Sequence, residues 1–237
     1  MGVPETFQGQ EGGRVGAVVS AITRHIRDNA LMPGDRLPSE IALSKELNVS
    51  RPVVREAFRS LAAMHIIELA TGRRATVAPL DHGPIALVIE HGVHIEQINV
   101  LQIYDVRRAI EGRIVALAAL RRSEAEARTI QDHARAMREA ATAEAVMEAD
   151  LAFHTALAAA ARNSVFALLV GAFQQITRTT WPIGWRSRTT AAMRTRMLET
   201  HREIADAVAA SDPVEAERQM ALHFDESART LIAAGLS

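Results

Sequence analysis

Four side chains in the second half of the chain are of the types that bind divalent metals. Asp150 and His154 are four residues apart in DLAFHTAL, so on a helix they share one face. His201 lies in ETHREIADAV and His223 in QMALHFDES, each on a later predicted helix. One carboxylate and three imidazoles that converge inside a helical bundle would make a metal site. Spacing alone also allows a plainer interpretation, in which each histidine is structural or exposed.

Three arginines in the first third of the chain are spaced for contact with nucleic acid. Arg51, Arg55 and Arg59 lie four residues apart in SRPVVREAFRSL, so on a helix they form one positive stripe. The opposite face carries the apolar Val54 and Phe58. Such a helix binds phosphates and reads guanine edges, because a guanidinium suits the bidentate geometry of guanine O6 and N7. Taken alone, the same spacing also fits an ordinary solvated face.

The segments around the arginine stripe predict a winged helix-turn-helix over residues 14–78. Ser50 is suited to cap the helix that carries the stripe, and Pro52 falls in its first turn, where a missing N–H costs nothing. A hairpin follows, with the turn at residues 71–74. The predicted elements are a helix over 13–30, a helix opened by Pro38-Ser39-Glu40 and closed by Asn48-Val49, the helix capped by Ser50, and strands over 65–69 and 75–78.

The rest of the chain predicts an antiparallel bundle of helices. Residues 79–96 are rich in proline and glycine and predict a linker with one short helix near 85–90. Trp181 and Trp185 are expected in a loop, because Trp181-Pro182-Ile183-Gly184 is a strong break. The expected helices cover 97–121, 123–142, 144–161, 164–180, 188–210 and 213–234. The predicted fold class is therefore mainly α, with an N-terminal winged helix-turn-helix followed by an all-α antiparallel helical bundle.

Composition excludes several classes of protein. The chain has no cysteine, which excludes disulfides, zinc ribbons and thiol catalysis. It has neither a membrane-length apolar run nor an N-terminal signal-peptide pattern, so residues 1–13 are expected to be a flexible tail and the protein cytoplasmic, without a membrane partner. Residues 14–78 hold ten Arg and Lys against six Asp and Glu, a balance of +4, whereas residues 79–237 hold seventeen against twenty, a balance of −3. This asymmetry favours an anion-binding first domain.

The run PGDRLPSEIALSKELNVSRPVVREAFRSL closely resembles the GntR family of bacterial regulators. The family's pattern is PG-x-x-LPSE, then VSR, then VRE-A-x-x-L, and the resemblance spans residues 22–78. It implies a domain that binds double-stranded DNA. The predicted DNA-contacting residues are Arg36, Ser50, Arg51, Pro52, Arg55, Arg59, Gly72 and Arg73.

Three positions depart from the GntR pattern. Ile41 stands where the family usually has an arginine that often contacts DNA, so that contact is expected to be missing. His65 replaces the usual glycine before the first wing strand, and Ala75 replaces a wing glycine. These changes are expected to alter the operator sequence or weaken binding without changing the fold.

The second half resembles the FCD ligand-binding domain of FadR-type GntR regulators. The resemblance covers about residues 97–233 and makes residues 97–237 an effector-binding domain. It implies that Asp150, His154, His201 and His223 hold one divalent metal ion, zinc first, with nickel or manganese as alternatives. Members of this group that respond to fatty acyl groups lack such a site, which argues against an acyl-CoA effector.

A site with three histidines and one aspartate leaves coordination positions open for a small carboxylate or hydroxy acid. The resemblance also points to organic and sugar acids. It implies that Arg107, in YDVRRAIEGRIVALAA, is the arginine that pairs with the effector's charge. The alternative for Arg107 is an ordinary ion pair with Glu111. Asn163 is expected to cap a helix rather than to contact a ligand.

Together these inferences predict a homodimeric regulator that binds a palindromic operator and is released by its effector, so that it acts as a repressor. No catalytic residues are assigned, and the chain is not expected to be an enzyme. Two alternatives stay open. One is a DNA-binding protein with a purely structural metal. The other is a metal-dependent hydrolase, which would need a general base near the metal, and no separate acid–base constellation is visible.

Overall fold

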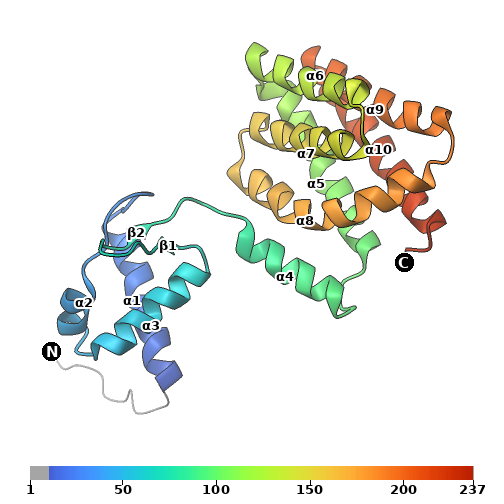
Figure 1. Cartoon of the computed structure of the whole chain (residues 1–237). Coiled ribbons are helices and arrows are strands. Elements are labelled where there is room, and N and C mark those ends of the chain that lie inside the picture. The colour runs from blue at the N-terminus through green and yellow to red at the C-terminus, as the bar shows by residue number, and fades with distance from the viewer. Residues whose placement is uncertain (1–10, 237) are drawn as a thin grey trace. The chain divides into compact units, whose positions relative to one another are not determined.

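The computed structural model describes residues 11–236 and forms two compact units, divided between Pro84 and Ile85 (Figure 1). Its described part is mainly helical, with one small hairpin, which confirms the predicted fold class. Of the expected N-terminal tail, residues 1–10 lie outside the described residues, whereas residues 11–13 belong to the first helix. Among the described helices, none combines the length and hydropathy needed to cross a bilayer.

In the N-terminal unit, three helices pack around one apolar core. They are α1 (Glu11–Asp28), α2 (Glu40–Glu46) and α3 (Arg51–Ala63). The largest fully buried side chains of this core are Ile22, Leu37, Leu61 and Ile67. The buried face of α3 carries Val54 and Phe58, as the sequence predicts, and this leaves its arginines on the solvent side. Burial of that apolar stripe is what fixes the rotation of α3.

The wing is a short antiparallel hairpin of β1 (Ile67–Glu68) and β2 (Thr76–Val77), with Ile67 opposite Val77. Both strands are shorter than expected. The segment before α2 lies on the other side of β2, where the Leu37 amide donates to the Ala75 carbonyl at 2.9 Å. Arg36 bridges to Thr76 in the same way. The core residue Leu37 and the exposed Arg36 are therefore both fixed to the wing.

The C-terminal unit is a bundle in which α5 packs against four other helices, α7, α8, α9 and α10. Figure 1 shows α5 running through the bundle between them. Side chains cap the N-termini of α5 to α10, among them Ser123, which forms a full capping box with Glu126, and Asn163, which accepts from the Val165 amide as expected. The helices are α4 (Gly83–His94), α5 (Val100–Arg121), α6 (Glu124–Glu139), α7 (Ala143–Ala160), α8 (Ser164–Ser187), α9 (Ala191–Ala209) and α10 (Pro213–Ala233).

Two elements differ from the sequence prediction. Helix α4 is twice as long as the short helix expected near 85–90, since Ile89 and Val93 pack against buried residues of α5 and α8. Helix α8 continues through the expected break, with Pro182 inside it. Trp181 stacks on Trp185 one turn later, with ring centroids 5.1 Å apart. The loop predicted for these tryptophans is therefore wrong, because tertiary packing outweighs the cost of one proline.

Candidate metal centre and candidate nucleic-acid interface

Three imidazoles from three helices meet in the core of the C-terminal unit. His154 lies on α7, His201 on α9 and His223 on α10, and one nitrogen from each lies within 4.8 Å of the others. Their exposed fractions are 3%, 0% and 9%. The rings of His201 and His223 are closest, with centroids 4.6 Å apart. The helices thus bring together residues that are far apart in the sequence.

Asp150 completes this cluster from the helix turn before His154. Its Oδ1 lies 2.8 Å from Nε2 of His201, and the residue is 4% exposed. Burial alone would raise the pKa of Asp150, but the hydrogen bond with His201 and the nearby imidazoles outweigh burial and lower it. The group therefore stays a carboxylate. Three of the four predicted metal ligands therefore form the cluster, and the fourth, Asp150, contacts it through His201.

Two of the imidazoles have their outer nitrogen committed to an acceptor. Nδ1 of His201 lies 2.8 Å from the carbonyl oxygen of Met197, and Nδ1 of His154 contacts the carboxylate of Glu111. Since a backbone carbonyl only accepts, Nδ1 of His201 carries a proton, and Nε2 is the nitrogen that faces the cluster. An outer acceptor of this kind also fixes the tautomer of metal-binding histidines.

The imidazole nitrogens that face the inside of the cluster are placed to bind a cation. Nε2 of His201 lies 2.8 Å from Oδ1 of Asp150, a contact that either a proton on Nε2 or a metal ion bound by both atoms would satisfy. Among the described residues, the buried Nε2 of His154 has no hydrogen-bond partner. Burial first, and then repulsion by a proton on either neighbouring imidazole, His201 or His154, hold the pKa of His223 well below its usual range, so this imidazole is neutral. A carboxylate with imidazole nitrogens is the donor set that borderline divalent ions prefer, so the residues fit a metal.

Glu111 links the cluster to Arg107. Its Oε1 accepts from Arg107 Nε at 2.8 Å, while its Oε2 contacts His154. Burial alone would raise the pKa of Glu111, but the charges of Arg107 and His154 outweigh it and lower the pKa to about 2. Arg107 also donates to Thr177 Oγ1 at 2.8 Å and lies over the Phe224 ring. The ion pair foreseen as the alternative role of Arg107 is therefore present, and it is buried.

Sequence reasoning named Glu111 only as a partner for Arg107. Its contact with His154 joins residues 43 positions apart, and nothing in the spacing of either motif indicates it. The one available signal is the spacing of Glu111, one helix turn after Arg107. This spacing puts both residues on the same face of α5, so that they are buried together.

The predicted DNA-contacting residues of the N-terminal unit are all exposed. A groove of about 820 Å³ separates α3 from the wing turn, and it is lined by Arg55 and Arg59 on one side and by Gly72, Arg73 and Arg74 on the other. Four of the predicted residues therefore share this groove. The other four do not line it: Arg36, Ser50, Arg51 and Pro52. Arg74 lines the groove although it is not among the predicted contacts.

Arg55 is held in place by Glu40 of α2. Its Nη2 lies 2.9 Å from a Glu40 carboxylate oxygen, and its Nε bonds the same carboxylate. The hydrogen bonds from Arg55 keep the pKa of Glu40 below its usual value. Because the pair is exposed, it gains little free energy, and a phosphate or a guanine edge can replace the carboxylate at low cost. Glu40 therefore positions Arg55 and leaves it able to contact DNA.

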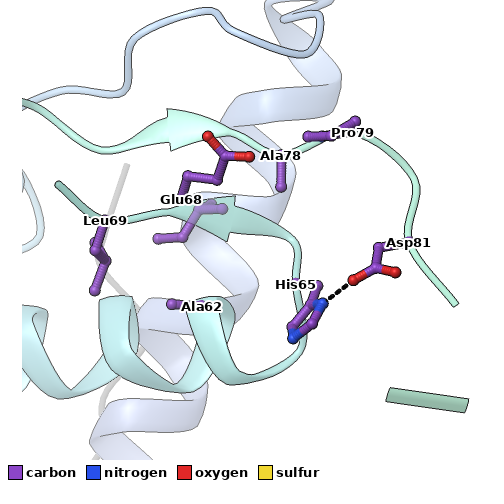
Figure 2. A pocket seen from close by; sticks show the side chains of 8 residues that line it. Ala62, His65, Glu68, Leu69, Ala78, Pro79 and Asp81 are labelled. Atoms are coloured by element: carbon purple, nitrogen blue, oxygen red, sulfur yellow. Dashed lines mark hydrogen bonds and ion pairs between the residues drawn. The ribbon is translucent and has the colours of Figure 1, made fainter. Parts of the chain in front are cut away.

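His65, which stands where a glycine was expected, adopts the left-handed conformation that glycine favours, with φ +54°. Its ring contacts the carboxylate of Asp81, and Figure 2 shows this pair at the edge of a pocket between the end of α3 and the hairpin. Asp81 also accepts from the Gly83 amide at the start of α4. Ala75 is buried in the domain core, and Ile41 is half exposed in the first turn of α2. The winged fold therefore accommodates all three departures.

Comparison with known proteins agrees with both halves of the chain. Residues 15–77 match the model of the bacterial regulatory proteins of the gntR family, and residues 102–226 match the FCD domain. The chain is 34% identical to the HTH-type transcriptional regulator LutR of Bacillus subtilis, over 84% of this chain and 92% of that protein. It is 28% identical to the galactonate operon transcriptional repressor of Escherichia coli, over 90% and 95% of the two chains.

A solved structure named Streptococcus agalactiae GntR has the same fold, with a TM-score of 0.67 and 24% identity, over 91% of this chain and 99% of that one. The families and relatives matched here are transcription regulators, not enzymes. On this evidence the chain belongs to the GntR family of DNA-binding transcription regulators, with an FCD domain behind its winged helix-turn-helix.

Proposed function

We propose that this chain is a transcription repressor whose affinity for its operator is controlled by a small carboxylate bound at a divalent metal ion in the FCD domain. The observation that carries the proposal is the convergence of three buried imidazole nitrogens within 4.8 Å, beside the carboxylate of Asp150. Asp150, His154, His201 and His223 would hold the ion, with zinc as the first candidate and nickel or manganese as alternatives.

The metal would supply a Lewis-acidic position for the effector's carboxylate. Four protein ligands leave room in an expanded coordination shell, and Arg107 is the residue we propose to pair with the effector's negative charge. Its guanidinium is already fixed by Glu111 and Thr177, so little side-chain entropy is lost on binding. The name of the galactonate operon repressor, one of the relatives, is in keeping with a sugar-acid or organic-acid effector.

On the DNA side, we propose that the chain acts as a homodimer on a palindromic operator. Two copies of α3 about one helical turn of DNA apart would read the two half-sites. The exposed arginines of α3 and the wing supply the phosphate and guanine contacts. The effector changes operator affinity only as far as it binds the DNA-bound and the free states unequally. We propose that the protein represses transcription and that the effector relieves this repression.

The first test is metal content, measured by inductively coupled plasma mass spectrometry on untagged protein. We expect near one divalent ion per chain in the wild type. His201→Ala should lose it, whereas His94→Ala, which changes an exposed histidine of α4 in the same unit, should keep it. Absence of metal from the wild type after incubation with zinc, nickel and manganese would overturn the metal-dependent part of the proposal.

A second measurement separates a sensor from a structural metal. Thermal denaturation of the metal-loaded protein is followed with and without a panel of small hydroxy acids and sugar acids. A sensor is stabilised by one of them only when the metal is present, because the ligand binds the native state. A metal that is purely structural raises the melting temperature by itself, and no acid adds to it.

A further inference from the structure

A small, partly open cavity of about 30 Å³ lies in the FCD domain, one helix turn from the histidine cluster. Three of its lining residues lie three or four positions from residues of the cluster or of the Arg107 network: Tyr104 precedes Arg107 on α5, Met197 precedes His201 on α9, and Ser227 follows His223 on α10. Four residues of α-helix rise about 6 Å. The cavity and the cluster are therefore neighbouring layers of one bundle.

Arg188 lines this cavity and has a buried nitrogen, Nε, without a hydrogen-bond partner among the described residues. Its exposed fraction is 6%. The nearest carboxylate oxygen, on Glu226, is 4.0 Å away, which is too far for a hydrogen bond. Burial lowers the pKa of Arg188, and the charges of Glu226 and Asp150 oppose this effect without cancelling it. Glu226 is therefore a distant ion-pair partner, and it leaves the buried Nε of Arg188 without a hydrogen-bonded acceptor.

The rest of the cavity is built to receive a polar group. The hydroxyl of Tyr104 lies 3.2 Å from Thr180 Oγ1, and both residues line the cavity. Thr180 donates to the Ile176 carbonyl at 2.9 Å, so its oxygen can accept the Tyr104 proton. Ser227 adds a third hydroxyl. A volume of about 30 Å³ holds about two waters or one carboxylate group.

The backbone of Arg188 is fixed from outside the cavity. Arg188 ends α8, and its carbonyl accepts from Arg194 Nε at 3.1 Å. The guanidinium of Arg194 lies over the ring of Trp185, 5.0 Å from its centroid. On the inner side, a Cβ on Gly184 would lie 3.3 Å from Arg188 Nη1, so the absence of a side chain there leaves room for the guanidinium. Such positioning is typical of a preorganised binding residue.

We infer that Arg188 binds a second anionic group of the effector, which makes the effector a small diacid. This inference rests on the proposed function, since the near carboxylate of the diacid would lie at the metal cluster. The spacing of about 6 Å between the two layers suits a five-carbon chain with a carboxylate at each end. Ser227 lines the same pocket and can donate its hydroxyl proton to the far carboxylate, and Tyr104 can join it by turning its proton away from Thr180.

The test compares two acids that differ only at the far end. 2-Hydroxyglutarate and 2-hydroxypentanoate share a five-carbon chain and a 2-hydroxy acid head, but the second ends in a methyl group. Calorimetric titration of the metal-loaded wild type should show binding of the diacid at least about 30-fold tighter, because a buried charge pair is gained. Arg188→Gln should reduce that ratio to near one. Arg186→Gln, an exposed arginine two residues earlier, should leave it unchanged.

Each result decides a different point. Equal affinity of the two acids for the wild type, failure of both to bind, or a ratio that persists in Arg188→Gln overturns the diacid subsite. If the wild type takes up no metal, the proposed function itself fails. The comparison of the two acids in the wild type needs no variant, so it remains valid even if Arg188→Gln does not fold. In that case Arg188→Lys tests whether a positive charge without the planar guanidinium keeps part of the preference for the diacid.

Discussion

Replacing Glu111 by glutamine tests whether the buried row of contacts from Arg107 through Glu111 to His154 stabilises the FCD domain. Glu111 is 1% exposed, and each of its two oxygens faces one donor, Arg107 Nε or His154 Nδ1. Glutamine has the same shape but only one acceptor oxygen, and its amide group donates. Glu111→Gln therefore leaves one of two buried donors facing another donor, and it leaves the charge of Arg107 without a counter-ion.

The expected loss follows from burial. Arg107 is 5% exposed, and removing one partner of a buried ion pair costs about 3 to 5 kcal/mol. For a chain of this length, each kcal/mol lowers the melting temperature by about 2 to 4 °C, so the FCD domain should melt about 6 to 20 °C lower. Metal affinity should fall about 10- to 100-fold, because His154 loses the acceptor that fixes its tautomer.

The assay is urea denaturation of the metal-free protein, followed by circular dichroism, with a separate metal titration of the folded protein. Glu139→Gln is the matched control, since Glu139 is an exposed residue of α6 with no ion pair in the described structure. Replacing both Arg107 and Glu111 by methionine should recover most of the stability, because no unpaired charge remains. If Glu111→Gln lowers the free energy of unfolding by less than about 1 kcal/mol, the contacts from Arg107 through Glu111 to His154 do not stabilise the domain as their burial implies.

The remaining predictions concern the N-terminal domain. Ser39→Ala should lower the free energy of unfolding by about 1 kcal/mol, because Ser39 caps α2 by accepting from the Ala42 amide at 3.2 Å. Ser50→Ala should cost less than about 0.5 kcal/mol, because Ser50 makes no side-chain cap bond at α3, but it should weaken DNA binding if Ser50 contacts DNA as predicted. Arg73→Ala should weaken binding to any duplex and make the negative salt slope, d log K/d log [salt], shallower by about one.

Urea denaturation measures the first two, and fluorescence anisotropy with a random-sequence duplex at several salt concentrations measures the third. Arg128→Ala is the control for DNA binding, since Arg128 is an exposed arginine of α6 in the other domain. Equal losses of stability in Ser39→Ala and Ser50→Ala would contradict the capping argument. An unchanged salt slope in Arg73→Ala would remove the wing from the DNA interface.

The sequence was sufficient for features that depend on periodicity and local chemistry. The apolar stripe opposite Arg51, Arg55 and Arg59 determines which face of α3 is buried, so the exposure of these arginines could be predicted. Asp150 and His154 share a face because they are one turn apart on α7. The convergence of the cluster, with ligands from three helices, was available only through resemblance to a family, because spacing does not determine how helices pack.

What the sequence could not show depends on contacts between distant segments. Pro182 is a strong local signal for a break, and only the packing of α8, with Thr177, Thr180 and Gly184 buried, reveals that the helix continues. The continuation has a consequence for the site. It carries Arg188 to the end of α8, where the guanidinium enters the bundle, whereas in a loop beginning at Trp181 its direction would be undetermined.

Helix α4 follows the DNA-binding domain along the chain, and its packing lies next to the proposed effector site. Ile89 and Val93 of α4 pack against Ile103 of α5 and Ile176 of α8, and these two residues immediately precede Tyr104 and Thr177, which belong to the site. Because packed cores adopt discrete arrangements rather than deforming continuously, a ligand that moves α5 or α8 must repack α4 as well. A ligand that binds equally well to both arrangements of α4 would leave operator affinity unchanged, however tightly it is held.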